Sequence, residues 1–185
     1  MENPLQVCSG CGMIGAMKKK EWIGGKLMKQ QTKLRLFIVL TLIWSGVIFS
    51  FSLQPSDASG MLSSGFTKWL LSTFLPDLWR ILEASPEKLA LFKFFIRKCA
   101  HFSEFCILGI FAFSAMRQTK LQKQAIISLG FCALIACADE TIQLFIEGRD
   151  GKLPDALLDT AGAATGIVLV LVACKVLAYF KKKKQ

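Results

Sequence analysis

Side chains that can catalyse a reaction or bind a ligand gather in three short stretches in the second half of the chain. Along the sequence they are Arg97, Lys98, His101 and Glu104, then Asp139, Glu140 and Gln143, and then Arg149, Asp155 and Asp159. Histidine acts as an acid or base near neutral pH, and arginine and lysine bind phosphate or carboxylate groups. Carboxylates orient a histidine or bind a hard divalent cation. The residue types therefore fit one polar site if the fold brings the stretches together.

The elements that carry these residues are long and apolar. The chain has 185 residues, is 53% hydrophobic and has a mean hydropathy of +0.47. A helix needs about 20 apolar residues to cross a bilayer. Four stretches approach this length: residues 36–53, 97–116, 125–146 and 155–180. No stretch alternates apolar and polar residues as a membrane barrel requires. We therefore predict an all-α membrane bundle of four transmembrane helices.

The basic residues indicate how the chain is oriented. Most of the 23 lysines and arginines precede residue 36, fill the link 117–123 or follow residue 174, whereas the segment 54–96 is neutral. Positively charged loops stay on the cytoplasmic side of bacterial membranes. We therefore expect a multi-pass protein of the bacterial cytoplasmic membrane with both termini inside and residues 54–96 and 147–154 outside. This distribution argues against a nucleic-acid partner, although the net charge is +10.

We divide the chain into a basic N-terminal tail, a transmembrane domain and a lysine-rich C-terminal tail, at residues 1–33, 34–180 and 181–185. The N-terminal tail is expected to be disordered and cytoplasmic. It contains one CxxC pair, Cys8 and Cys11, with no second pair nearby to complete a zinc site. The other five cysteines lie in or beside apolar stretches, where cysteine behaves as a small hydrophobe. We therefore assign no disulfide framework, no metal and no cofactor.

The segment between the first two predicted helices has local structure of its own. Pro55 stops the first helix. Apolar residues between Met61 and Leu75 follow helical spacing, which predicts a short helix. This helix either lies on the outer leaflet or packs across the top of the bundle. Ser85-Pro86-Glu87 is a helix start, and we expect this helix to continue into the second transmembrane helix.

Helical geometry predicts that the three polar stretches meet. At 1.5 Å per residue, their side chains lie ~10 Å or less below the outer surface on three helices. Asp155 and Asp159 share one face with Gly162 and Gly166. Small residues four apart let a neighbouring helix approach closely. The acidic face of the last helix is thus its packing face and should point into the bundle.

Two interpretations of this cluster stay open. Arg97, Lys98 or Arg149 could neutralise the acids in a structural network that locks the helices together. The alternative is a functional site, which the excess of carboxylates favours. Glu104, Asp139, Glu140, Asp155 and Asp159 outnumber the nearby bases.

The same residues carry a family resemblance. The stretches RKCAHFSEF from residue 97, ADETIQLFIEGRDG from residue 138 and DALLDTAGAATG from residue 155 occur in this order. Together they resemble the signature of the VanZ-like family, and the match covers roughly residues 36–178. Asp159 stands where the family often has asparagine. The resemblance implies a small polytopic bacterial membrane protein with a cell-envelope role. The founding member is linked to low-level resistance to the glycopeptide teicoplanin.

Two functions follow as hypotheses. In the first, the protein binds an outer-leaflet lipid or a lipid-linked wall precursor and lowers glycopeptide access. Arg97, Lys98 and Arg149 would meet phosphate or carboxylate groups of the ligand. Further ligand-binding candidates are Gln143, Asp155 and Asp159.

In the second hypothesis the protein is an enzyme that acts on an envelope lipid, with His101 as acid or base. Glu104 or Asp139 would orient the imidazole, and Glu140 is a further catalytic candidate. The carboxylates could instead hold Mg²⁺ or Ca²⁺. Whether the protein is an enzyme stays open. A proton-coupled transporter fits less well, because the acids are confined to one leaflet.

Overall fold

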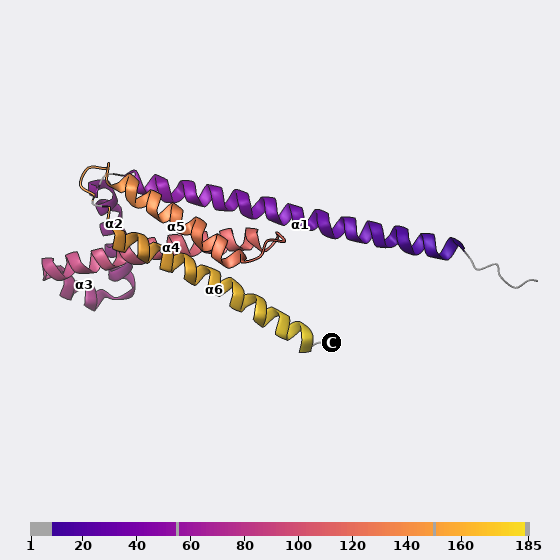
Figure 1. The fold of residues 1–185 in the computed structure, drawn as a ribbon. Coiled ribbons are helices and arrows are strands. Elements are labelled where there is room, and N and C mark those ends of the chain that lie inside the picture. The colour runs from indigo at the N-terminus through magenta and orange to yellow at the C-terminus, as the bar shows by residue number, and fades with distance from the viewer. Residues whose placement is uncertain (1–8, 55, 150, 184–185) are drawn as a thin grey trace, which may run out of the picture.

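The computed structural model describes residues 9–54, 56–149 and 151–183. Within these ranges the secondary structure is entirely helical (Figure 1). The helices are α1 (Ser9–Ser52), α2 (Ser56–Phe74), α3 (Pro76–Glu83), α4 (Pro86–Met116), α5 (Gln124–Gln143) and α6 (Leu153–Lys183). Leu27–Ser52 of α1 and the whole of α4, α5 and α6 are long and apolar enough to cross a membrane. The predicted bundle of four transmembrane helices is confirmed.

The helix boundaries follow local chemistry. α1 begins at Ser9 and ends at Ser52, three residues before Pro55. α4 starts with Pro86 in its first turn and runs unbroken to Met116, as predicted. α3 was not predicted, although Pro76 also stands at its start and Asp77 in its first turn. Cys8 lies outside the described residues, as does the side chain of Cys11, and the tail boundaries stay a prediction.

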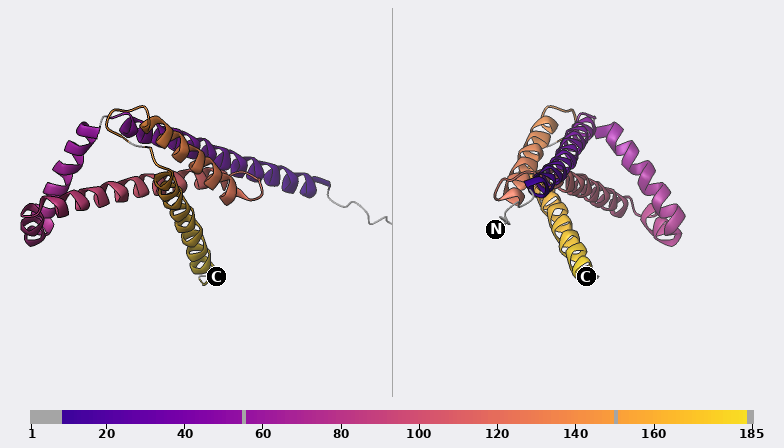
Figure 2. Two further views of the ribbon diagram at one scale, coloured as in Figure 1. Left: turned by 60° about the vertical axis from the view of Figure 1, so that its left-hand side comes forward. Right: turned by 90° about the vertical axis from the view of Figure 1, so that its right-hand side faces the viewer.

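α4 is the central helix of the bundle. It packs against α1, α5 and α6, and α2 and α3 lie beside its N-terminal half (Figures 1 and 2). The links α1–α2 and α5–α6 lie at one end of the bundle. The link α4–α5 lies at the other end, and the last turns of α6 point in the same direction while diverging from the other helices. α2 contacts both α3 and α4.

The core is a narrow seam between the four long helices. Ile48, Phe105, Leu108, Cys132 and Ala136 are buried in it. Trp44 of α1 packs against this seam, and its Nε1 donates a hydrogen bond of 2.8 Å to the backbone oxygen of Glu104. Many large apolar side chains remain exposed on the outside of the bundle. Such a surface suits a lipid environment.

Glycines bring α4 and α6 into backbone contact. A Cβ atom at Gly162 would collide with the backbone oxygen of Phe102, and one at Gly166 with that of Cys106. From the other side, a Cβ atom at Gly109 would collide with the backbone of Ala163. The two helices can therefore cross this closely only with glycine at these positions. The crossing holds the polar stretch of α4 against that of α6.

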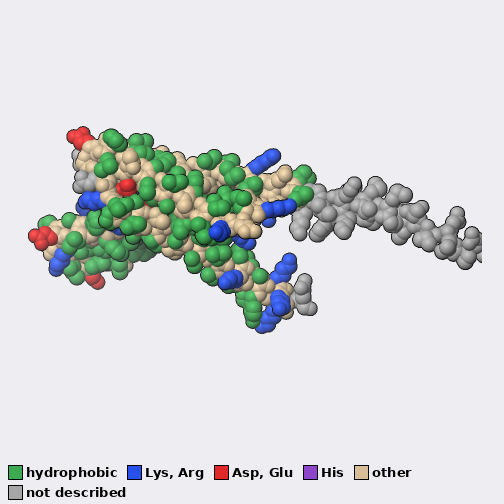
Figure 3. Space-filling model, viewed as in Figure 1, with side chains coloured by type: hydrophobic (Ala, Val, Ile, Leu, Met, Phe, Trp, Pro, Cys, Tyr) green, Lys and Arg blue, Asp and Glu red, His purple; other side chains and the backbone are tan. Residues whose placement is uncertain are grey.

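Charge is distributed unevenly between the two ends of the bundle. Figure 3 shows lysine and arginine side chains, and no acidic ones among the described residues, around the last turns of α6 and on the neighbouring part of α1. The visible acidic side chains lie towards the opposite end, together with further basic ones. The last turn of α6 alone contributes Lys181, Lys182 and Lys183. The expected orientation, with the lysine-rich end of α6 in the cytoplasm, depends on this asymmetry.

Cysteine labelling tests that orientation. In a variant with the seven native cysteines replaced, we expect E87C at the start of α4 to react with a membrane-impermeant maleimide in intact cells. K120C, in the link between α4 and α5, serves as the matched control and should react only after the cells are permeabilised. Both positions are exposed in the protein. The reverse labelling pattern would show that the orientation is inverted.

Candidate functional site

α4, α5 and α6 surround a polar cavity at the end of the bundle where α5 is linked to α6. Its volume is about 190 Å³. Most of the site residues predicted from sequence line it: Arg97, Lys98, His101, Glu140, Gln143, Arg149, Asp155 and Asp159. Asp139 lies beside this lining, within 4.8 Å of ligand atoms on His101 and Asp159. Glu104 Oε2 lies 3.9 Å from His101 Nδ1. The fold thus gathers all three polar stretches.

A second, larger cavity adjoins the polar one. It measures about 480 Å³ and lies between the end of α1, the middle of α2 and the polar stretch of α4. Its lining includes Phe51, Phe66, Ile96, Ala100 and Glu104. Arg97, His101 and Arg149 border both cavities. No feature of the sequence predicted this apolar cavity, because it depends on how α1, α2 and α4 pack together with Arg149 of the α5–α6 link.

Asp139 is held from two sides. Its side chain is completely buried. Ser52 Oγ of α1 donates a hydrogen bond of 2.5 Å to Asp139 Oδ1, and Gln143 Nε2 donates one of 2.9 Å to Oδ2. The network ties the end of α1 to α5. Ser52 was not among the predicted site residues, because no local signal links it to a residue 87 positions away.

Two further acids, Asp155 and Glu140, have structural partners. Lys98 Nζ of α4 forms an ion pair with the carboxylate of Asp155 at the start of α6, and both side chains are about three quarters buried. Glu140 Oε2 accepts a hydrogen bond of 2.8 Å from the backbone nitrogen of Lys152. These contacts fix the beginning of α6 against α4 and α5. They correspond to the structural network considered above, so part of the cluster has that role.

Arg149 is held in place while part of its guanidinium group lacks a partner. Gly148, just before it, has a φ of 72°, a left-handed conformation that glycine adopts without strain. Arg149 Nη2 donates a hydrogen bond of 3.1 Å to the backbone oxygen of Phe51. Nε and Nη1 are buried and have no hydrogen-bond partner in the described part of the protein. Burial lowers the pKa of Arg149, but arginine stays protonated at neutral pH.

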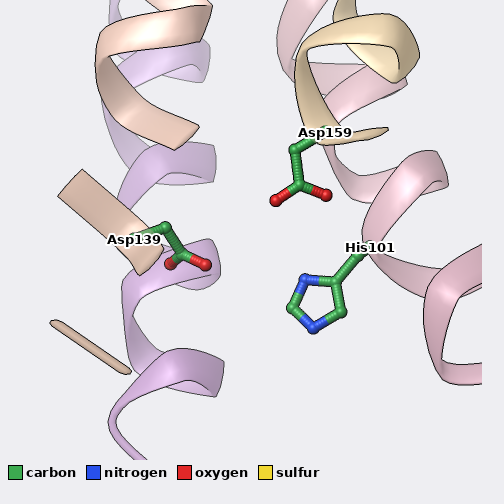
Figure 4. Close-up of side chains that lie close together, drawn as sticks. All are labelled: His101, Asp139 and Asp159. Carbon is green, nitrogen blue, oxygen red and sulfur yellow. The ribbon is translucent and has the colours of Figure 1, made fainter. Parts of the chain in front are cut away.

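His101, Asp139 and Asp159 converge on the same space from three helices (Figure 4). One ligand atom of each lies within 4.8 Å of the others. His101 Nδ1 and both carboxylate oxygens of Asp159 are buried and have no hydrogen-bond partner among the described residues. Buried polar atoms without partners are rare, and those of a charged group are especially costly. The structural contacts at Asp139, Glu140 and Asp155 therefore do not satisfy the whole cluster.

Four apolar helices that enclose a charged site near one end define a polytopic membrane protein with a buried polar site. A family model described as VanZ/LLP1 matches residues 37–175, and the chain belongs to this family. The resemblance predicted from the three polar stretches is thus confirmed, and all the site residues lie within the matched range. Neither the comparison with curated proteins nor that with solved structures gives a match.

Proposed function

We propose that this VanZ-like protein is a cell-envelope factor of the bacterial cytoplasmic membrane. Its polar site, at the extracytoplasmic face, binds the head group of an envelope lipid or lipid-linked wall precursor. Occupation of this site lowers the access of glycopeptides such as teicoplanin to their target. Both termini lie in the cytoplasm.

The observation that carries this proposal is the pair of adjoining cavities with Arg149 between them. A guanidinium group that stays charged in a partly buried place needs an anionic partner or ordered water. Nε and Nη1 of Arg149 have no such partner within the described residues. Phosphate and carboxylate groups match the planar geometry of arginine and can accept two parallel hydrogen bonds from it.

The apolar cavity favours a lipid over a free anion. It opens next to the charged residues and presents Phe51, Phe66 and Ile96. A ligand with a phosphate and a hydrocarbon chain could occupy both cavities, with the phosphate near Arg97 and Arg149. Lys98 contributes less than predicted from sequence, because Asp155 already neutralises it. The site thus combines a few converging polar groups with apolar walls, as ligand sites usually do.

Removing the charge of Arg149 is expected to weaken lipid binding. In R149Q, purified in nanodiscs, the affinity for a polyprenyl monophosphate should fall about 10- to 100-fold, the usual value of a charge-assisted hydrogen bond. Affinity for the matching polyprenol, which lacks the phosphate, should be weak and unchanged. Binding can be measured by native mass spectrometry at several lipid concentrations.

R80Q provides a matched control, because Arg80 is an exposed arginine of α3 outside both cavities. It should bind the polyprenyl monophosphate like the wild type. Equal affinities for R149Q and the wild type would refute the assignment of Arg149 to the phosphate.

An enzyme that acts on an envelope lipid is the second candidate. His101 Nδ1 lies 3.9 Å from Glu104 Oε2, and both residues border the apolar cavity. A histidine oriented by a carboxylate can act as acid or base. Mass spectrometry of lipid extracts separates the two candidates. A lipid species that appears or disappears only in cells with the active protein would favour the enzyme.

A further inference from the structure

We propose that His101, Asp139 and Asp159 bind a divalent transition-metal ion between α4, α5 and α6. This site goes beyond the proposed lipid binding and does not depend on it. It also differs from the sequence-based expectation, which assigned no metal and considered only Mg²⁺ or Ca²⁺ as ions that the carboxylates could hold.

The geometry suits a three-ligand site. A tetrahedral ion about 2.1 Å from its ligands holds them about 3.4 Å apart. The ligand atoms of the three residues lie within 4.8 Å of one another. Rotations of His101 and Asp159, whose atoms here have no hydrogen-bond partner in the described part of the chain, would close the remaining gaps. All three side chains already point toward the same space (Figure 4). The three backbones are held in place by the glycine crossing of α4 with α6 and by the packing of α5.

Asp159 gives an independent indication of a cation site. Its side chain is 1% exposed, and neither carboxylate oxygen has a hydrogen-bond partner within the described part of the chain. The ion pair to Lys98 is made by Asp155 and not by Asp159. An isolated buried carboxylate is among the most costly groups in a protein interior, and such groups are normally paired or bound to a metal. Asp159 is directed at His101, whose Nδ1 also lacks a partner.

Asp139 has the support that metal ligands usually have. Ser52 and Gln143 each donate a hydrogen bond to one of its oxygens, which fixes the orientation of the carboxylate. Each oxygen keeps a lone pair for a metal. Outer hydrogen bonds of this kind orient metal ligands and strengthen metal binding. Glu140 and Asp155 do not belong to the ligand set, because Lys152 and Lys98 engage them.

The donor atoms select the class of metal. One imidazole nitrogen with two carboxylate oxygens suits Zn²⁺ or Mn²⁺, whereas Mg²⁺ and Ca²⁺ prefer oxygen alone. Two carboxylates also neutralise the two charges of the ion. Three protein ligands leave at least one coordination position open, as in catalytic zinc sites. That position would face the polar cavity, which His101 and Asp159 both line.

Metal analysis of the purified protein tests this site. The protein is prepared without a polyhistidine tag and with Cys8 and Cys11 replaced by serine, so that neither can bind metal. After equilibration with Zn²⁺ or Mn²⁺ and removal of excess ion, mass spectrometry should find about one ion per chain. The affinity should fall more than about 100-fold in H101A and in D159N, since each loses a direct ligand. E147Q, which removes an exposed carboxylate outside the cluster, should bind like the parent protein.

Thermal unfolding gives a second readout that does not require the variants to be as stable as the parent. The added ion should raise the Tm of the parent and of E147Q but not that of D159N. The inference is wrong if the parent binds neither ion, or if D159N and H101A bind them like the parent. A protonated Asp159 that needs no metal would give the first of these results. No lipid is added, so failure here leaves lipid binding by Arg149 untouched.

Discussion

Replacing Gly166 with leucine is expected to lower the amount of protein that accumulates in the membrane several-fold. A Cβ atom at this position would overlap the backbone oxygen of Cys106 on α4, and a leucine would place three more carbon atoms in the same space. The obstacle is backbone, so no side-chain rotation can relieve it. Overpacking a core with one or two extra methylenes typically costs about 1–3 kcal/mol. The cost here is larger, because α4 and α6 must separate along their closest contact.

Accumulation can be measured by immunoblotting of membrane fractions, and folding by size-exclusion chromatography in detergent. G166L should accumulate several-fold less than the wild type and elute as aggregate. The control is G130L on α5, where a Cβ atom meets nothing within 4 Å and the position faces outward. If G166L and G130L accumulate equally and both elute like the wild type, the crossing of α4 and α6 is not as close as described.

The parts of the fold that the sequence predicted are those set by local pattern. Apolar length identified the four spans, and Pro55 and Pro86 marked a helix end and a helix start. The rise and turn of a helix then placed residues from three helices at one depth. Asp159 was expected to point into the bundle because it shares a face with Gly162, and it is buried opposite His101. Each of these inferences needs the geometry of only one helix.

The parts that the sequence did not predict depend on how the helices cross. The excess of acidic over basic residues in the sequence gave no indication of which acids have a partner. In the structure Lys98 pairs with Asp155, and the backbone nitrogen of Lys152 donates to Glu140. Ser52 reaches Asp139 only because α1 packs beside α5. The apolar cavity needs α2 to lie beside α4, and α2 has no pattern that specifies this position.

These contacts divide the polar cluster into two groups of residues. Asp139 is tied by hydrogen bonds to Ser52 and Gln143, so changing it removes support between α1 and α5. His101 and Glu104 differ from Asp139. Their side chains approach each other to 3.9 Å, between His101 Nδ1 and Glu104 Oε2, and neither makes a hydrogen bond within the described residues. A polar side chain whose burial costs free energy, and which makes no contact that stabilises the fold, is a candidate for function.

The variants H101Q and E104Q are therefore expected to lose function while the protein still accumulates. Each replaces a polar side chain by one of similar size and breaks no hydrogen bond of the scaffold, so the loss of stability should stay below about 1 kcal/mol. In a host whose teicoplanin susceptibility the wild-type protein lowers, each variant should restore the susceptibility of cells without the protein. Immunoblotting of the membranes should show accumulation within about twofold of the wild type.

The variant D139L shows what a scaffold defect looks like in the same assay. It removes the acceptor of the buried Ser52 and Gln143 side chains, which keep only the 3.4 Å hydrogen bond from Gln143 Nε2 to Ser52 Oγ. The fold should therefore lose about 1–3 kcal/mol, and the protein itself should be several-fold depleted. A functional role and a structural role are distinguished by comparing the effect of each variant on teicoplanin susceptibility with the amount of that variant in the membrane. If H101Q and E104Q are depleted like D139L, the cluster holds the helices together and nothing more. If they accumulate and still lower the susceptibility, these two residues have no part in the function. Loss of activity at normal protein level is the result that only a functional site produces, because a structural role acts through the amount of folded protein.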